Sequence, residues 1–142
     1  RLIISIGLIF FLLSLNSFSY PRYSSDGDTK KQKLFFVIPN NGEEVTSPFK
    51  VEFGLTGMDV VPAGIDKPMS GHHHLLIDVK KLPDMKSPIP ADKNHLHFGK
   101  GQKEATIELP KGKHTLQLLL GNYLHVPHDK PLISERIEII VK

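Results

Sequence analysis

Short apolar runs with a two-residue period follow one another from Leu34 to the end of the chain. In segment 49–55 apolar and polar residues alternate, as expected for a strand that buries one face. The same alternation places Ile137, Ile139 and Val141 on one face of the last run. The pattern therefore predicts strands over the segments 34–38, 49–55, 73–79, 105–109, 114–120 and 133–141.

Turn-forming residues separate these runs. Pro39-Asn40-Asn41-Gly42 closes the first run, and Pro110-Lys111-Gly112 divides two later ones. No segment carries a long helical period. Several short strands at a spacing of roughly 8–12 residues favour an all-β fold, an immunoglobulin-like antiparallel β-sandwich of about seven strands.

The beginning of the chain has a different pattern. Arg1 precedes an apolar run, and small residues follow up to Ser19, which is typical of a secretory signal peptide. The run is short for a bilayer span, which needs about 20 apolar residues, and an uncleaved anchor is the alternative. We expect a signal peptide at 1–19, a polar flexible linker at 20–33 and one domain at 34–142. The expected location is the periplasm or the exterior, without stable membrane insertion after cleavage.

Charge and cysteine content exclude several classes of function. The 142 residues carry a formal net charge of +3 with interspersed signs, which does not favour nucleic acid as a partner. The chain has no cysteine, which excludes blue-copper centres, iron–sulfur clusters and cysteine-based zinc sites. Any metal would be held by histidine, methionine, carboxylate or backbone oxygen.

Histidines are the most informative residues of this sequence. The chain has eight, and seven of them lie in three short segments, 72–74, 95–97 and 125–128. Residues i and i+2 of an extended chain point the same way, so each of the first two segments offers a pair of imidazoles on one face. Neutral imidazole is the commonest metal ligand in proteins. The predicted metal ligands are His72, His74, His95, His97, His125 and His128.

The order of the predicted strands brings the three segments together. The strand after His72 leads away from one end of the sandwich, segment 81–93 is long enough to return, and strand 114–120 returns as well. Only His114 is expected apart, as a structural residue at a corner where immunoglobulin-like domains often carry tyrosine. His73 points to the opposite face, as a buried core-edge residue or a second-shell group, and Asp78 is a weaker candidate ligand.

Nitrogen ligands favour copper over zinc in affinity, and both metals accept imidazole, so the predicted cofactor is copper or zinc. Met58 and Met69 precede the first histidine segment, and a thioether would favour Cu(I). Both methionines are instead expected to fill gaps in the core.

Several motifs in order resemble the bacterial family called domain of unknown function 4399. The motifs occupy segments 53–58, 62–64, 71–78, 95–102, 109–117 and 121–128, and the likeness covers about Phe36 to Val141. This resemblance implies a small exported bacterial domain, and it brings no established activity.

The leading functional hypothesis is an exported copper- or zinc-binding protein that acts as a chaperone, buffer or sensor, with another envelope protein as a possible partner in metal transfer. A metal-dependent enzyme is one alternative, with Asp66 or Asp92 as a general base, but no catalytic motif is present and no catalytic residue is predicted. The other alternative is a structural or adhesive module in which the histidines form a hydrogen-bond network.

Overall fold

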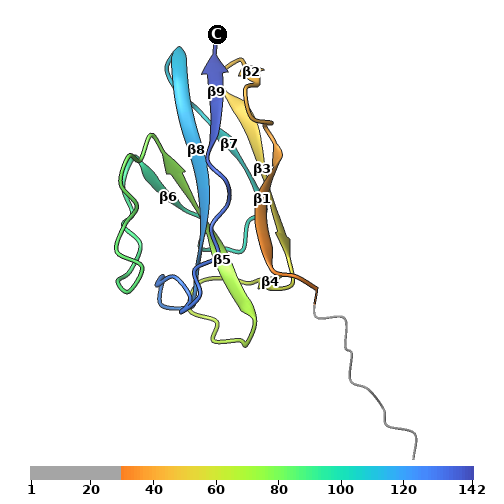
Figure 1. Ribbon diagram of the computed structural model, residues 1–142, viewed down its shortest axis with the longest axis vertical. Helices are drawn as coiled ribbons and strands as arrows, with labels where there is room; N and C mark the ends of the chain where they lie inside the picture. Colours follow the sequence, from red (N-terminus) through yellow and green to blue (C-terminus); the bar gives the residue numbers. More distant parts are fainter. Residues whose placement is uncertain (1–29) are drawn as a thin grey trace, which may run out of the picture.

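The computed structural model describes residues 30–142, and this part of the chain contains strands and no helix. The predicted signal peptide and residues 20–29 of the predicted linker lie outside the described residues. Among residues 30–142, no helix is both long enough and apolar enough to cross a membrane. The strands are β1 (Lys33–Ile38), β2 (Glu44–Val45), β3 (Phe49–Thr56), β4 (Asp59–Val60), β5 (Ser70–Ile77), β6 (His95–His97), β7 (Glu104–Ile107), β8 (Gly112–Gly121) and β9 (Ile137–Val141) (Figure 1).

The strands form two sheets that face each other as a sandwich (Figure 1). One sheet has the order β1-β3-β7, and the other has the order β2-β9-β8-β5-β4, with β6 also paired to β5. The long neighbours are antiparallel, whereas the short pairs β2–β9 and β4–β5 are parallel. The predicted all-β sandwich is confirmed.

The strand limits differ from the predicted ones in two informative places. β5 ends at Ile77 because Asp78 adopts a positive φ of 56°, which turns the backbone out of the ladder. β9 begins at Ile137, four residues later than expected. Upstream of it, Ile133 still pairs with Leu119 of β8 as an isolated bridge, and the Ser134 hydroxyl then accepts a hydrogen bond from the Leu118 amide, so regular pairing is interrupted before Ile137.

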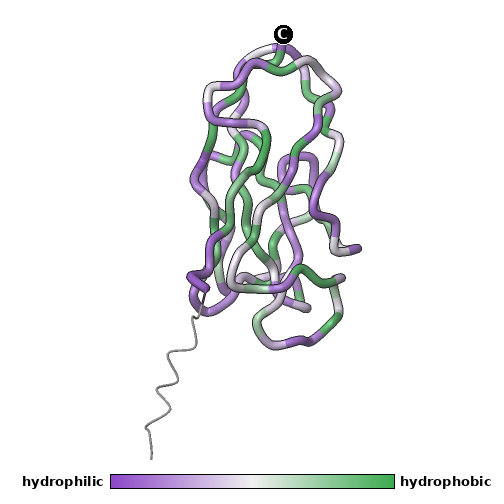
Figure 2. The backbone as a smooth tube through the Cα atoms, turned by 90° about the vertical axis from the view of Figure 1, so that its right-hand side faces the viewer, coloured by the Kyte–Doolittle hydropathy of each residue, from purple (hydrophilic) through white to green (hydrophobic). Residues whose placement is uncertain are grey.

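The main core lies between the two sheets. Val51 of β3 and Leu75, Leu116, Leu118 and Ile139 of the opposite sheet are completely buried. Each such side chain stabilises the fold by about 1.5–3 kcal/mol relative to an exposed one. Figure 2 shows apolar stretches (green) and polar stretches (purple) along the strands of the sandwich.

A second, smaller apolar cluster covers the outer face of β5 and β8. It consists of Leu76, Ile89 and Leu119, with Val79, Met85 and Ile133 packed against it. Because both faces are covered, every residue of β5 is buried. This unusual burial of one strand positions the histidines described next.

Candidate metal centre

Three consecutive histidines lie in strand β5. His72, His73 and His74 are at most 1% exposed. His73 points into the main core, where its ring lies 5.0 Å from that of Phe53. His72 and His74 lie on the outer face, with their ring centroids 4.8 Å apart. The alternation of a strand therefore separates one core histidine from a facing pair.

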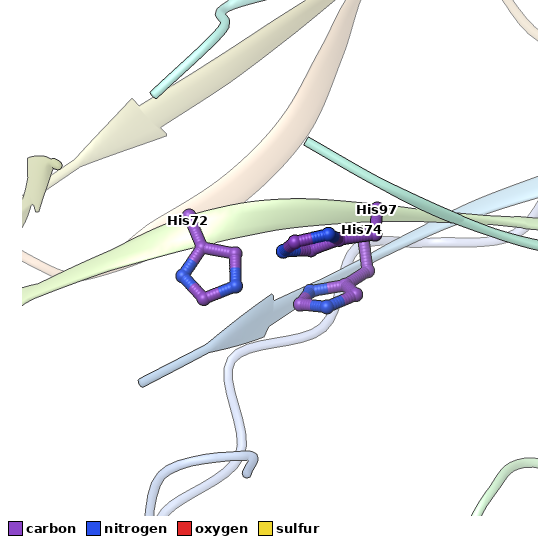
Figure 3. A group of neighbouring side chains, drawn as sticks. All are labelled: His72, His74 and His97. Atoms are coloured by element: carbon purple, nitrogen blue, oxygen red, sulfur yellow. The ribbon is translucent and has the colours of Figure 1, made fainter. Parts of the chain in front are cut away.

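Strand β6 adds a third imidazole to this pair. In the β5–β6 register His97 lies opposite His74, and its ring is 5.1 Å from His74 and 5.0 Å from His72. Each of the three side chains offers one nitrogen such that all three nitrogens lie within 4.8 Å of one another (Figure 3). His97 is exposed, whereas the other two are buried. The group is therefore buried on the side of His72 and His74 and accessible to solvent on the side of His97.

A fourth ring, that of His125, lies over the same group. Its centroid is 4.7 Å from His97 and 5.0 Å from His72, but 6.2 Å from His74. The loop that carries it is held by backbone hydrogen bonds from the Ile89 amide to the His125 carbonyl and from the His125 amide to Asn122. His125 has a positive φ of 65°, a conformation that non-glycine residues adopt at a cost.

Two glycines make room for these rings. A Cβ atom at Gly121 would lie 2.7 Å from Cε1 of His74, and one at Gly99 would overlap the ring of His97. Gly121 is the last residue of strand β8 and does not lie in a turn, whereas Gly99 lies in the turn that follows β6. A glycine in a strand without a turn is the sequence signal that a neighbour approaches closely.

The buried rings lack hydrogen-bond partners. Both ring nitrogens of His72 and Nδ1 of His74 are buried without a partner, as are both nitrogens of the core residue His73 and Nδ1 of His128. Leaving a buried polar group unsatisfied costs about 1–3 kcal/mol, and such groups in native proteins call for an explanation, an ion among others. The arrangement is thus unfavourable for the protein by itself.

The same burial keeps the imidazoles neutral. Burial, reinforced by the neighbouring histidines, lowers the pKa of His72 to about 4 and that of His74 to about 3. Burial and His125 lower the pKa of His97 as well. A neutral imidazole has a free lone pair on one nitrogen, so all three rings are in the state that binds a metal at neutral pH.

The other predicted ligands lie outside this group and have partners of their own. His95 lies opposite Leu76, two residues along β6 from His97, and its Nδ1 is 2.9 Å from an oxygen of Asp92. Nε2 of His128 donates a hydrogen bond to the Ser70 carbonyl. Asp78 accepts hydrogen bonds from His114 and from the Thr115 amide. The structure therefore brings together His72, His74, His97 and His125, and not His95, His128 or Asp78.

His114 occupies the opposite end of the same two central strands. Its Nδ1 donates to the Asp78 carboxylate at 2.7 Å, and its Nε2 donates to the Pro110 carbonyl at 2.8 Å. A ring whose two nitrogens both donate is an imidazolium. Although burial opposes charge, these hydrogen bonds and the Asp78 charge raise the His114 pKa. The interpretation of His114 as a structural corner residue is confirmed.

The methionines divide between two environments. Met58 packs against the main core as expected. The same expectation for Met69 is wrong, because this residue is 56% exposed and its sulfur lies 3.7 Å from Nε2 of Gln32. A positive φ of 55° at Met69 turns the chain just before β5 and leaves the side chain outside the core.

The fold and the site together define an all-β sandwich with a histidine group on the outer face of its larger sheet. The sequence model of the family described as "Domain of unknown function (DUF4399)" matches residues 51–142, and the chain belongs to this family. The resemblance found in the motifs is thereby confirmed.

Two further comparisons add little. No curated protein matches the chain. Among solved structures, the chain is similar to an endo-beta-1,4-mannanase from Thermotoga petrophila, with 12% identity and a TM-score of 0.47. The likeness covers 83% of this chain but 21% of the mannanase chain, and no conclusion is drawn from it.

Proposed function

We propose that this protein binds copper or zinc through His72, His74 and His97 as an exported metal chaperone, buffer or sensor. Three neutral imidazoles from two paired strands are a ligand set that both metals accept. The observation that carries this proposal is that buried nitrogens of His72 and His74 without hydrogen-bond partners belong to a group in which three imidazole nitrogens lie within 4.8 Å of one another. A bound ion would take one nitrogen of each ring as a ligand.

The alternative of a purely structural histidine network has less support. A network would join the rings to one another or to the backbone, and no hydrogen bond of this kind reaches the ring nitrogens of His72 within the described residues. His114 shows what a structural histidine looks like in this fold, with both nitrogens bonded.

An enzymatic role also has less support. Of the two candidate general bases, Asp92 is engaged with His95 and the Asn94 amide. Within residues 30–142 the close group contains histidines and no carboxylate. Export to the periplasm or exterior remains part of the proposal and is supported by the signal-like pattern of residues 1–19.

The proposal is tested by metal loading of the protein purified without a polyhistidine tag. The protein is dialysed against trace Cu²⁺ and Zn²⁺, and bound metal is measured by mass spectrometry. We expect about one ion per chain in the wild type. His74→Leu keeps the buried volume filled but removes a ligand, and we expect its metal affinity to fall by at least about 100-fold, since losing even an outer-shell partner costs 10- to 100-fold.

His73→Leu is the matched control for this variant. It changes the adjacent residue on the same strand, with the same burial but on the opposite face of the sheet. Metal retained in His73→Leu and lost in His74→Leu supports the site. No metal in the wild type at neutral pH overturns the proposal.

A further inference from the structure

The ligand group carries no negative charge. The charges that lower the pKa of His72, His74 and His97 all come from other histidines. The two carboxylates nearest in sequence to these strands are engaged elsewhere, Asp78 with His114 and Asp92 with His95. A divalent ion bound here would keep its full charge next to a buried strand, and an uncompensated charge in such a place is costly.

Three histidine ligands would also leave one coordination position of a bound ion free, on the side of His97. Three protein ligands leave a fourth position in a tetrahedral zinc site. His72 and His74 close the buried side, and the exposed His97 marks the side that opens to solvent. A ligand from solution would therefore reach the ion beside β6.

His125 lies at this open side without belonging to the close ligand group. Its ring centroid is 4.7 Å from that of His97 and 5.0 Å from that of His72, but 6.2 Å from that of His74. A neutral imidazole has one N–H group, which can donate a hydrogen bond to a group bound at the ion. The backbone hydrogen bonds that join His125 to Ile89 and Asn122 hold the loop that carries this ring.

We propose that the metal-loaded site binds a small anion, such as hydroxide, a carboxylate or azide, in its fourth position, with His125 as the hydrogen-bond donor to this anion. The inference rests on the proposed function and specifies the ligand class of the same site. The anion supplies the negative charge that the protein ligands lack. A metal-bound anion with a protein donor beside it is held more strongly than by the ion alone.

The test is a titration of the Cu²⁺-loaded protein with azide, followed by the azide-to-copper charge-transfer absorption and by electron paramagnetic resonance. We expect saturable binding of one azide per copper in the wild type. His125→Gly removes the ring and suits the positive φ of this position. This variant should keep its copper and bind azide about tenfold more weakly, the loss expected for one charge-assisted hydrogen bond.

The possible outcomes separate the two proposals. If the wild type binds copper but not azide, the anion proposal fails and the metal site stands. If His125→Gly loses its copper, His125 is itself the fourth ligand, and the anion proposal fails again. If the wild type binds no copper, the proposed function has failed. His95→Ala is the control, because it removes the other imidazole of strand β6, which is bonded to Asp92. Azide binding by this variant should equal that of the wild type.

Discussion

The two ends of strands β5 and β8 carry histidines in opposite situations. At one end, His114 is charged, and each of its nitrogens has an acceptor. At the other end, His72 is completely buried, neutral and without a partner for either nitrogen. The number of histidines therefore does not distinguish a ligand from a structural residue. Two bonded nitrogens mark His114 as structural, whereas unpaired nitrogens occur both in the close group and in His73 on the opposite face, so a ligand must also have other ligand nitrogens near it.

The difference has an energetic meaning. The bonds of His114 to charged and carbonyl oxygens stabilise the corner between Asp78 and Pro110, by about 1.5–3 kcal/mol for a bond to a charged group. The unpaired nitrogens of the cluster cost stability in the metal-free protein. A site that is kept at such a cost is expected where function requires it.

Acidification should change the free energy of unfolding in opposite directions through the histidines at the two ends. The pKa values of His72, His73 and His74 are about 4, 4 and 3, below the ordinary value of 6.5. Below pH 6.5 these three histidines are protonated in the unfolded chain but remain neutral in the folded protein. Each of them therefore lowers the free energy of unfolding by about 1.4 kcal/mol for every pH unit. We expect the free energy of unfolding, measured with urea, to fall by several kcal/mol between pH 6.5 and 5.

His114 contributes in the other direction. Its raised pKa means that its stabilisation is fully present below pH 6.5 and is lost as the pH rises through the folded-state value. His114→Ala should lower the free energy of unfolding by about 3 kcal/mol at pH 6, because two hydrogen bonds are lost, and by less at pH 9. Metal loading should be unchanged. An equal loss at both pH values would contradict the charged state of this ring.

Gly121 offers a way to disturb the cluster from its neighbour. The Cβ atom of Gly121→Ala would meet Cε1 of His74 at 2.7 Å, so the ring must move. We expect metal affinity to fall by about tenfold and stability by about 1–3 kcal/mol, the range for overpacking a core. Isothermal titration calorimetry and urea unfolding measure the two effects. Gly112→Ala tests a glycine without close neighbours but with a φ of 131°, and it should cost stability while leaving metal affinity intact.

The smallest effect is expected at His95. This histidine shares the strand of His97 but has Asp92 as its partner. His95→Ala should change the free energy of unfolding by about 1 kcal/mol or less, since the contact is partly exposed, and should leave metal affinity as in the wild type. If this variant lost its metal, the expectation that a histidine bonded to a carboxylate is not a ligand would be contradicted.

The sequence predicted the sandwich well because strands such as β3 alternate in hydropathy and because turn residues separate the short apolar runs. The short strands β2, β4 and β6 contain two or three residues, too few for a period. The order of the predicted strands also placed the three histidine segments at one end, and the register confirms this for β5 and β8, where His72 lies opposite Gly121.

Which histidines meet could not be predicted from the sequence. The two-residue period correctly gave His95 and His97 one face, but the register sets His97 opposite His74 and His95 opposite Leu76. The position of His125 depends on a positive φ, which cannot be predicted from the residue type. Long-range partners such as Asp78 for His114 lie 36 residues apart and follow from the fold alone.

The most direct test of the account is the urea unfolding of wild type and His74→Leu, each with and without Zn²⁺ at pH 7. The account predicts that metal-free His74→Leu is as stable as the metal-free wild type or more stable, because an unpaired buried nitrogen is removed. It also predicts that Zn²⁺ at about 100 times its dissociation constant stabilises the wild type by about 2.7 kcal/mol and leaves His74→Leu unchanged. A metal-free variant that is clearly less stable than the wild type, together with no effect of Zn²⁺ on either protein, would contradict the account and favour a structural role for the cluster.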